Sequence, residues 1–117
     1  MGRMVKISVI TPTIRPLGLE LIAKALKSQT FQDFEWVICS KELPQSAEVW
    51  QLPMTHLPGD FEGGFWSLNR AYNALFREAK GELIVSWQDW IWAKPDALEK
   101  FWLAYQSTEG KAVISGV

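Results

Sequence analysis

Residues 79–90 read Ala79-Lys80-Gly81-Glu82-Leu83-Ile84-Val85-Ser86-Trp87-Gln88-Asp89-Trp90, a turn followed by a short apolar run and a single carboxylate. Four apolar or small residues in a row are typical of a parallel strand that is buried on both faces. Ligand sites in open α/β sheets gather where such strands end. The stretch therefore predicts a buried parallel strand, and it makes Asp89 a better functional candidate than an acid on a helix face.

The segments on either side of this strand alternate between strand and helix patterns. We expect further strands at 6–10, 34–39, 54–57 and 111–117, with the 34–39 strand central, a loop at 58–64, and helices at 17–29, 48–52, 68–79 and 96–105. Ser67 is a candidate N-cap for the third helix, and Gly81 is a candidate terminator. The alternation predicts an α/β fold, a Rossmann-like three-layer sandwich with a mostly parallel sheet.

Length and composition favour one ordinary globular domain over residues 1–117. The chain is 48% hydrophobic and 21% charged, and its net charge of -1 offers no global field for nucleic acid or an anionic membrane. No segment approaches the roughly 18 apolar residues of a membrane span. Cys39 is the only cysteine, so no internal disulfide can form, and we expect it to be a buried strand residue in a cytoplasmic protein.

Several familiar sites are absent from the sequence. No Gly-rich phosphate loop follows the first strand, which argues against dinucleotide and P-loop classes. His56 is the only histidine, so neither a zinc cluster nor a Ser/His/acid triad is expected, and a loop or edge-strand position suits it best. Most of the seven tryptophans are expected to pack in the core, and Trp90 and Trp92 are the candidates for ligand stacking because they flank Asp89.

Three groups of polar residues are candidate ligand contacts, each with a structural alternative. Thr11-Pro12-Thr13 follows the first strand and either contacts a ligand or forms an ordinary turn into the helix. Asn69, Arg70 and Asn73 either hold a phosphate or sugar near a helix start or form a solvated face. Asp89 either ligates Mg²⁺ or Mn²⁺ through its oxygens, with help from Gln88, or caps the turn after its strand.

Four passages resemble family 2 glycosyltransferases in their order and spacing over nearly the whole chain. They are Ser8-Val9-Ile10-Thr11-Pro12-Thr13, Gln29-Thr30-Phe31-Gln32-Asp33-Phe34-Glu35-Trp36-Val37-Ile38, Ala71-Tyr72-Asn73 with residues 79–84, and Trp92 with Pro95-Asp96-Ala97-Leu98-Glu99-Lys100. The resemblance implies the nucleotide-diphospho-sugar transferase type of fold, of which this chain is the N-terminal, nucleotide-sugar-binding half. The expected ligand is a UDP- or GDP-linked sugar.

The resemblance also implies which residues form the site. The donor is expected against Thr11, Pro12, Thr13 and Ser40, with Arg70 standing in for the arginine that Tyr72 replaces, and with Asn73. The family's Asp-x-Asp metal motif aligns with Gln88-Asp89-Trp90, so Asp89 is the expected ligand of Mg²⁺ or Mn²⁺. The acidic pair that ends the family's second strand aligns with Ser40-Lys41.

These departures leave three hypotheses open. The first is a glycosyltransferase-like protein that binds a nucleotide-sugar for transfer, completed by a C-terminal region or a partner that supplies the acceptor site and base. The second is a truncated or degenerate module that binds the donor without turnover. The third is an α/β domain kept for assembly, including a homo-oligomer, with tryptophans at its interface. The strand-like segment 111–117 at the chain's end indicates either a truncation or one half of a larger fold.

Overall fold

The computed structural model describes residues 5–14, 18–59, 67–88 and 91–108. Within these ranges the strands are β1 (Ile7–Pro12), β2 (Phe34–Ser40), β3 (Met54–Pro58) and β4 (Leu83–Ser86), and the helices are α1 (Leu19–Lys27), α2 (Ala47–Trp50), α3 (Leu68–Glu78) and α4 (Ala97–Gln106). Each lies within two residues of its predicted bounds. The predicted strand at 111–117 and most of the predicted loop at 58–64 lie outside the described residues.

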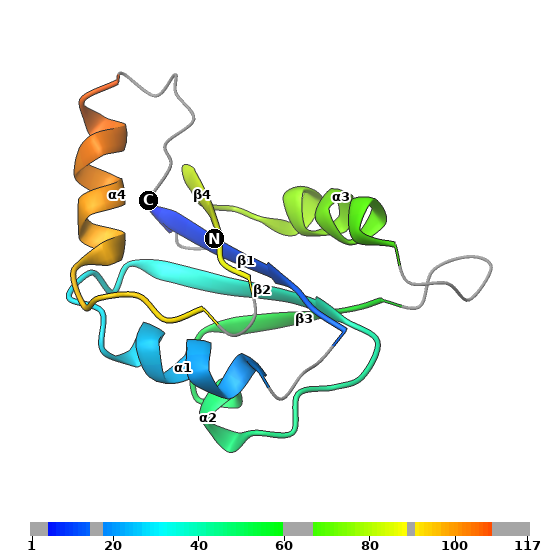
Figure 1. Cartoon of the computed structure of the whole chain (residues 1–117). Coiled ribbons are helices and arrows are strands. Elements are labelled where there is room, and N and C mark those ends of the chain that lie inside the picture. The colour runs from blue at the N-terminus through cyan, green and yellow to red at the C-terminus, as the bar shows by residue number, and fades with distance from the viewer. Residues whose placement is uncertain (1–4, 15–17, 60–66, 89–90, 109–117) are drawn as a thin grey trace.

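The strands form one parallel sheet in the order β3-β2-β1-β4. Helices connect them on both faces, so the predicted α/β class and Rossmann-like arrangement are confirmed (Figure 1). β1 runs two residues further than predicted, because Thr11 and Pro12 pair with Ile38 and Cys39 of β2. Pro12 is tolerated because the bond to β2 at this point is made by the next residue: the Thr13 N–H donates to the Cys39 carbonyl.

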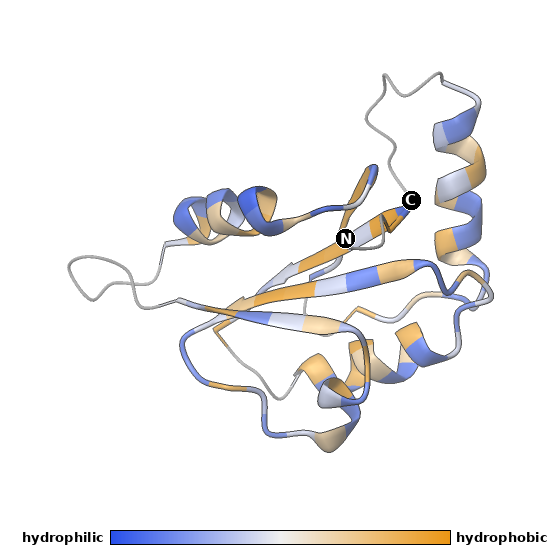
Figure 2. Cartoon of the chain, turned by 180° about the vertical axis from the view of Figure 1, so that it is seen from behind, coloured by the Kyte–Doolittle hydropathy of each residue, from blue (hydrophilic) through white to orange (hydrophobic). Residues whose placement is uncertain are grey.

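The larger half of the core lies between the sheet and helices α1, α2 and α4. Alternate residues of the strands point to this face, and the helices meet them with apolar stripes. Figure 2 shows the hydrophobic residues concentrated in the strands and on parts of each helix. The cluster of buried residues contains Ile7, Val9, Leu19, Ile22, Ala23, Ala25, Leu26, Phe34, Trp36, Ile38, Val49, Val85, Trp87, Leu98 and Trp102.

The opposite face of the sheet is covered by α3 and has a smaller core. Ala71 and Leu75 of α3 pack against Ile10, Val37 and Cys39, which point away from the first cluster. Figure 1 shows α3 alone on this face, with α1 and α2 on the other. A shift of one residue in the strand register would therefore move each buried strand side chain from one core to the other.

α4 lies across the edge of the sheet at which the strands begin. The Trp102 ring packs against Phe31, just before β2, with ring centroids 5.9 Å apart, and the Lys6 ammonium, just before β1, lies 5.5 Å from a Trp102 ring centroid. The Tyr105 hydroxyl donates to a carboxylate oxygen of Glu82, just before β4, at 3.1 Å. The N-terminal edge of the sheet is thus occupied by a helix, whereas loops leave the C-terminal edge.

Gln29 fixes the start of α4 to the end of α1. Its buried amide group donates to the carbonyls of Ala25 (3.1 Å) and Lys94 (2.9 Å), and its oxygen accepts from the N–H of Leu98 at 3.0 Å. The N–H of Thr30 donates to the Pro95 carbonyl at 2.7 Å. Gln29 and Thr30 therefore have a structural role. They bond to backbone groups at the start of α4, where the Asp96 side chain forms no cap.

The structure corrects the prediction that the strand at 83–86 is buried on both faces. β4 pairs with β1 on one side only among the described residues, and Ile84 and Ser86 are exposed while Val85 is buried. Four residues are too few for periodicity to separate a central from an edge strand. The prediction for 34–39 was right, since β2 lies between β1 and β3.

Gly81 has a different role from the predicted helix terminator. α3 ends at Glu78 with Ala79 as its C-cap, so Gly81 lies beyond the helix. A Cβ at Gly81 would lie 2.5 Å from the Ser8 nitrogen and 2.7 Å from the Ile7 carbonyl carbon. Glycine is required because the chain passes against the backbone of β1. Within the described residues no helix is both long and apolar enough to span a membrane.

Candidate functional site

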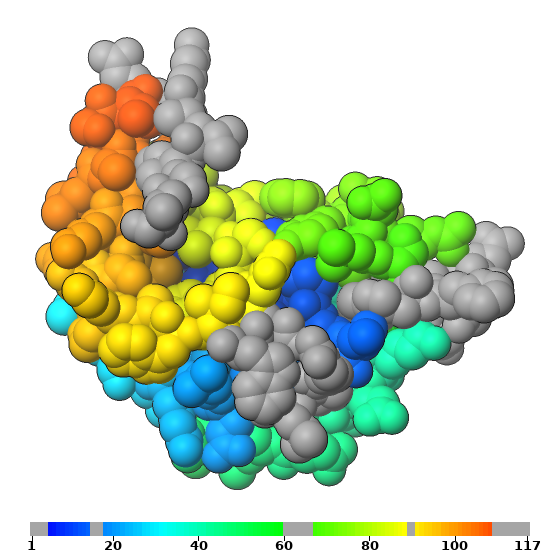
Figure 3. Space-filling view, viewed as in Figure 1, coloured from blue at the N-terminus to red at the C-terminus, as the bar shows by residue number. Residues whose placement is uncertain are grey.

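The candidate site is the sheet edge at which β1, β2 and β4 end. The strand order reverses at β1, since β2 and β3 are added on one side of it and β4 on the other. In open α/β sheets a ligand crevice forms outside the carboxyl ends of strands at such a reversal. Figure 3 shows the blue residues of β1 between the yellow segment after β4 and the green α3.

Thr11 faces the interior at this edge and uses its hydroxyl twice. The hydroxyl donates to the Trp87 carbonyl at 2.7 Å and accepts from the Trp36 indole N–H at 3.0 Å, in fully buried surroundings. The predicted ligand contact at Thr11 is therefore limited, because the side chain's donor hydrogen is already engaged by protein.

Pro12 and Thr13 bring the end of β1 beside the end of β2. Pro12 is in register with Cys39, and the Thr13 N–H donates to the Cys39 carbonyl at 3.0 Å. Thr13 is only 3% exposed. The predicted group of Thr11, Pro12, Thr13 and Ser40 is thus brought together by strand pairing, although its members are largely buried.

Ser40 ends β2 and is held by His56 of the edge strand β3. The Ser40 hydroxyl donates to the Glu42 carbonyl at 2.6 Å, and His56 Nε2 lies 2.9 Å from that hydroxyl and 3.1 Å from the Ser40 carbonyl oxygen. The Ser40 carbonyl also accepts from the Gly59 N–H at 3.0 Å. Because both Ser40 atoms then act as acceptors toward the ring, the contacts favour the tautomer with hydrogen on Nε2.

The neighbouring Cys39 is a buried strand residue, as predicted. Its thiol lies 3.9 Å from the Pro58 carbonyl oxygen, and burial raises the pKa of the thiol to about 11. A thiol with so high a pKa is a poor nucleophile and a poor metal ligand at neutral pH. Cys39 is therefore part of the small core under α3.

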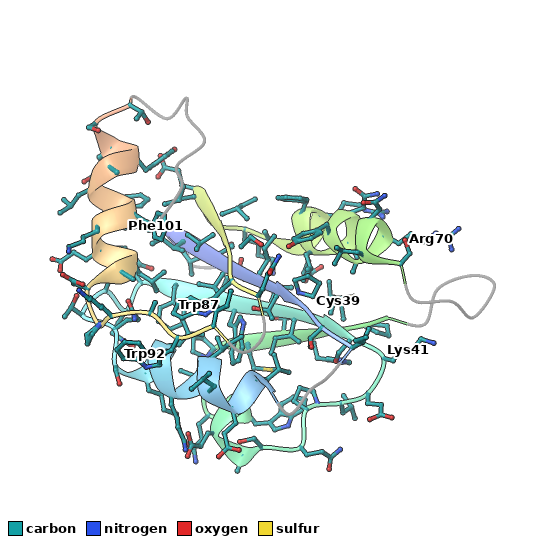
Figure 4. The ribbon with its side chains drawn as sticks, viewed as in Figure 1. Cys39, Lys41, Arg70, Trp87, Trp92 and Phe101 are labelled. Carbon is teal, nitrogen blue, oxygen red and sulfur yellow. The ribbon has the colours of Figure 1, made fainter. Side chains whose placement is uncertain are left out.

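Cationic groups and a helix start approach the same edge. Ser67 caps α3, since its hydroxyl accepts from the Arg70 N–H at 3.3 Å, which confirms the predicted cap. Arg70 and Asn73 are both exposed on α3. Figure 4 places Arg70 at the beginning of α3 and Lys41 just after β2, at the same end of the sheet. Helix N-termini and paired cations favour anionic ligands such as diphosphates.

The predicted metal ligand Asp89 lies outside the described residues, so the structure gives no geometry for it. Gln88, which precedes it, is exposed at the end of β4. Across the described ranges no group of three or more His, Cys, Asp or Glu residues is placed to hold a metal ion. In the sequence after β4 the candidate donors are the Gln88 amide and the Asp89 carboxylate, a set that suits a cation also ligated by substrate phosphates.

The tryptophans divide into buried and exposed groups. Trp36, Trp87 and Trp102 are buried, in agreement with the predicted packing role, and Trp50 and Trp92 are exposed. Trp90, the other stacking candidate, and Trp66 lie outside the described residues. Trp92 follows β4 and is 55% exposed, but Figure 4 places it on the side of α1 and α4, away from Arg70 and Lys41.

Two contacts at the site were not predicted. His56 was expected only at a loop or edge strand, and its bonds to Ser40 depend on the β2–β3 register. The indole of Trp87 donates to the Ile91 carbonyl at 2.6 Å, which a sequence pattern does not reveal. In both contacts a side chain bonds to an oxygen on a neighbouring strand or across a turn. The hydrophobic periodicity of the sequence does not reveal such contacts.

Comparison with known proteins supports the fold at the level of structure. No protein-family model matches the chain, and no curated protein matches it by sequence. The crystal structure of S. aureus TarS, a family 2 glycosyltransferase, is similar with a TM-score of 0.72 at 18% identity over 89% of this chain and 20% of that one. The structure of TarS 1-349 has the same TM-score at 19% identity, over 89% and 33% of the two chains.

The chain therefore has a glycosyltransferase-like fold, as the resemblance implied. It spans a third or less of the length of either TarS chain. At these identities the likeness concerns the arrangement of strands and helices. The substrates and activity of the longer proteins are a matter for proposal.

Proposed function

We propose that the chain is the donor-binding half of a glycosyltransferase-like protein, and that it binds a UDP- or GDP-linked sugar at the C-terminal edge of its sheet. The observation that supports this proposal most is the reversal of strand order at β1 within a glycosyltransferase-like fold. In open α/β sheets a ligand binds outside the strand ends at such a reversal, which here are the ends of β1, β2 and β4. The N-terminal edge is occupied by α4, so it does not compete for the ligand.

The charges at this edge support a diphosphate ligand. Lys41 follows β2, and Arg70 lies in the first turn of α3, where the helix dipole adds partial positive charge. The family's acidic pair at the end of the second strand is absent here, since Ser40-Lys41 takes its place. Base recognition therefore falls to backbone groups at the strand ends, because the Ser40 hydroxyl is buried and already donates to the Glu42 carbonyl. The cations are expected to bind the phosphates.

A divalent cation fits this proposal in a limited way. Asp89 and Gln88 supply one carboxylate and one amide oxygen at the end of β4, which is enough for Mg²⁺ or Mn²⁺ only if the donor's phosphates complete the coordination. When bound, such a cation would neutralise charge on the diphosphate. We therefore propose that metal affinity depends on the nucleotide.

A second candidate is a binding module without turnover. One observation favours it: a single carboxylate, Asp89, stands where the resemblance calls for two. Sugar transfer needs an acceptor site and a base for the acceptor hydroxyl. Under this proposal the chain binds donor alone and transfers sugar only with a further region or partner.

Titration calorimetry with UDP and GDP, each with and without Mn²⁺, tests the proposal. We expect weak binding of one nucleotide that Mn²⁺ strengthens. Asp89→Asn should remove the Mn²⁺ enhancement, and the control Asp96→Asn, at the start of α4 beside the opposite edge, should keep it. Absence of heat at millimolar ligand under every condition would contradict donor binding. Unchanged Mn²⁺ dependence in Asp89→Asn would contradict the metal role alone.

A further inference from the structure

Ser40, the last residue of β2, is held by the edge strand β3 and the residue after it. Its carbonyl oxygen accepts from the Gly59 N–H at 3.0 Å and from His56 Nε2 at 3.1 Å, and its hydroxyl oxygen lies 2.9 Å from the same ring nitrogen. Ser40 is completely buried. Because a carbonyl oxygen can only accept, Nε2 carries the hydrogen that reaches both Ser40 oxygens.

The Ser40 hydroxyl also fixes the chain that follows β2. It donates to the Glu42 carbonyl at 2.6 Å, two residues further along, and so closes a tight turn around Lys41. Serine hydroxyls stabilise turns by such local bonds to the backbone. Residues 41–45 belong to no helix or strand, so this bond sets the direction in which the chain leaves the sheet.

Lys41 is exposed within this turn, at the C-terminal edge of the sheet (Figure 4). We propose that His56 is a positioning residue: it fixes Ser40, Ser40 fixes the turn 40–42, and the turn holds Lys41 toward a nucleoside diphosphate. The consequence for binding rests on the proposed function, in which Lys41 contacts the phosphates. His56 itself makes no contact with the ligand in this arrangement.

An ordered turn favours binding because a loop that is already fixed loses less conformational entropy when the ligand arrives. His56 supplies the donor from β3 that reaches the Ser40 hydroxyl, whereas the Gly59 N–H reaches only the carbonyl. Loss of the imidazole should therefore loosen the turn while β2 and β3 stay paired. Diphosphate affinity should decrease with it.

Three variants separate positioning from general destabilisation. His56→Leu removes the ring donor. His56→Gln restores a donor, because the glutamine amide nitrogen lies as many bonds from Cβ as Nε2 does. Thr55→Val is the matched control, since Thr55 precedes His56 on β3 and is exposed. The measurements for each are NMR order parameters at Lys41 and Glu42 and calorimetry with UDP and GDP in the presence of Mn²⁺.

The native ring gives a separate spectroscopic readout. His56 is the only histidine, so its two ring nitrogens give one assignable pair of ¹⁵N signals. We expect the hydrogen on Nε2 and none on Nδ1 at mildly alkaline pH. The opposite tautomer would remove the donor on which the inference depends.

We expect the order parameters of Lys41 and Glu42 to fall from about 0.85 to below about 0.6 in His56→Leu. They should stay at the native value in His56→Gln and in Thr55→Val. Nucleotide affinity should fall about fivefold in His56→Leu, as the loss of one hydrogen bond would cause, and recover in His56→Gln.

A double-mutant cycle tests whether His56 acts through Lys41. Added to Lys41→Ala, His56→Leu should cost little further affinity, because both changes then remove the same phosphate contact. Added to Arg70→Ala on α3, it should still cost about fivefold.

The order parameters decide the positioning role without any ligand. If the native chain binds neither nucleotide, the proposed function fails, and the order parameters alone test His56. Unchanged order parameters in His56→Leu, an equal fall in Thr55→Val, or no recovery in His56→Gln would overturn the inference. A looser turn with unchanged affinity, or a fivefold loss that persists in Lys41→Ala, would overturn the link to phosphate binding.

Discussion

Gly81 shows how one residue ties a loop to the sheet. Its N–H donates to the Ser8 hydroxyl at 2.6 Å, and that hydroxyl donates to a Glu35 carboxylate oxygen at 2.5 Å. The same Glu35 oxygen accepts from the Lys80 N–H at 2.7 Å. The turn before β4 is thereby bound to β1 and β2, and only a residue without a Cβ fits so close to the β1 backbone.

We expect Gly81→Ala to destabilise the protein by about 3 kcal/mol, because the new methyl group meets backbone atoms of Ile7 and Ser8 that cannot move aside. The free energy of unfolding in urea measures the effect. Lys80→Ala, next to it and exposed, should cost less than about 0.5 kcal/mol. Equal stability of Gly81→Ala and the native chain would contradict the close approach.

The Cys39 thiol makes stability depend on alkaline pH. Burial raises its pKa from 9.0 to about 11, so between these values the unfolded chain loses a proton that the folded chain keeps. Stability from this group is complete below pH 9 and decreases as the pH rises toward 11. We expect the unfolding free energy of the native chain to fall relative to that of Cys39→Ala between pH 9 and pH 11. A constant difference from pH 8 to pH 11 would refute the shift.

At the scale of elements, the contact between α1 and α4 depends on Gln29. Its side chain satisfies two carbonyls and the Leu98 N–H, all in a buried position. Gln29→Leu has a similar size and leaves these groups unpaired, so we expect a loss of about 3 kcal/mol in the free energy of unfolding. Gln45→Leu is the control, since Gln45 is exposed and bonds only to the nearby Leu43 carbonyl. Similar losses in both variants would contradict the bridging role of Gln29.

The sequence predicted the bounds of the helices and strands better than the contacts around them. Apolar stripes and turn residues place β2 and α3 to within a residue, and Ser67 is identified as a cap by residue type alone. The position of β4 at the edge of the sheet, as far as the described residues form it, was missed, because a four-residue apolar run has the same pattern in an edge or a central strand. Gly81 was misassigned because its close neighbours in β1 lie more than seventy positions away.

The candidate site was predictable in location but not in contacts. Strand ends in a parallel sheet necessarily meet at one edge, so Thr11, Thr13 and Ser40 could be grouped from the sequence. Their availability to a ligand could not be predicted. It depends on the burial of Thr11, whose hydroxyl is bonded to the Trp36 indole and the Trp87 carbonyl, and on the register that sets His56 beside Ser40. Long-range side-chain hydrogen bonds leave no periodic trace in the sequence.

At the scale of the whole molecule, the two edges of the sheet are used differently. α4 contacts residues just before β1, β2 and β4, and the loops after the same strands carry the polar and cationic candidates. This asymmetry, together with the reversed strand order and the glycosyltransferase-like fold, places the proposed donor site at the C-terminal edge.

The most direct measurement is a two-dimensional amide NMR titration of the whole chain with UDP or GDP in the presence of Mg²⁺, repeated with a trace of paramagnetic Mn²⁺. We expect shifts at Thr13, Lys41 and Gln88, and Mn²⁺ broadening strongest near Gln88. Ser8, Gly81 and Tyr105, at the opposite edge, should stay unchanged and serve as the internal control. Shifts concentrated on those three residues, or none with either nucleotide at millimolar concentration, would contradict the proposed donor site.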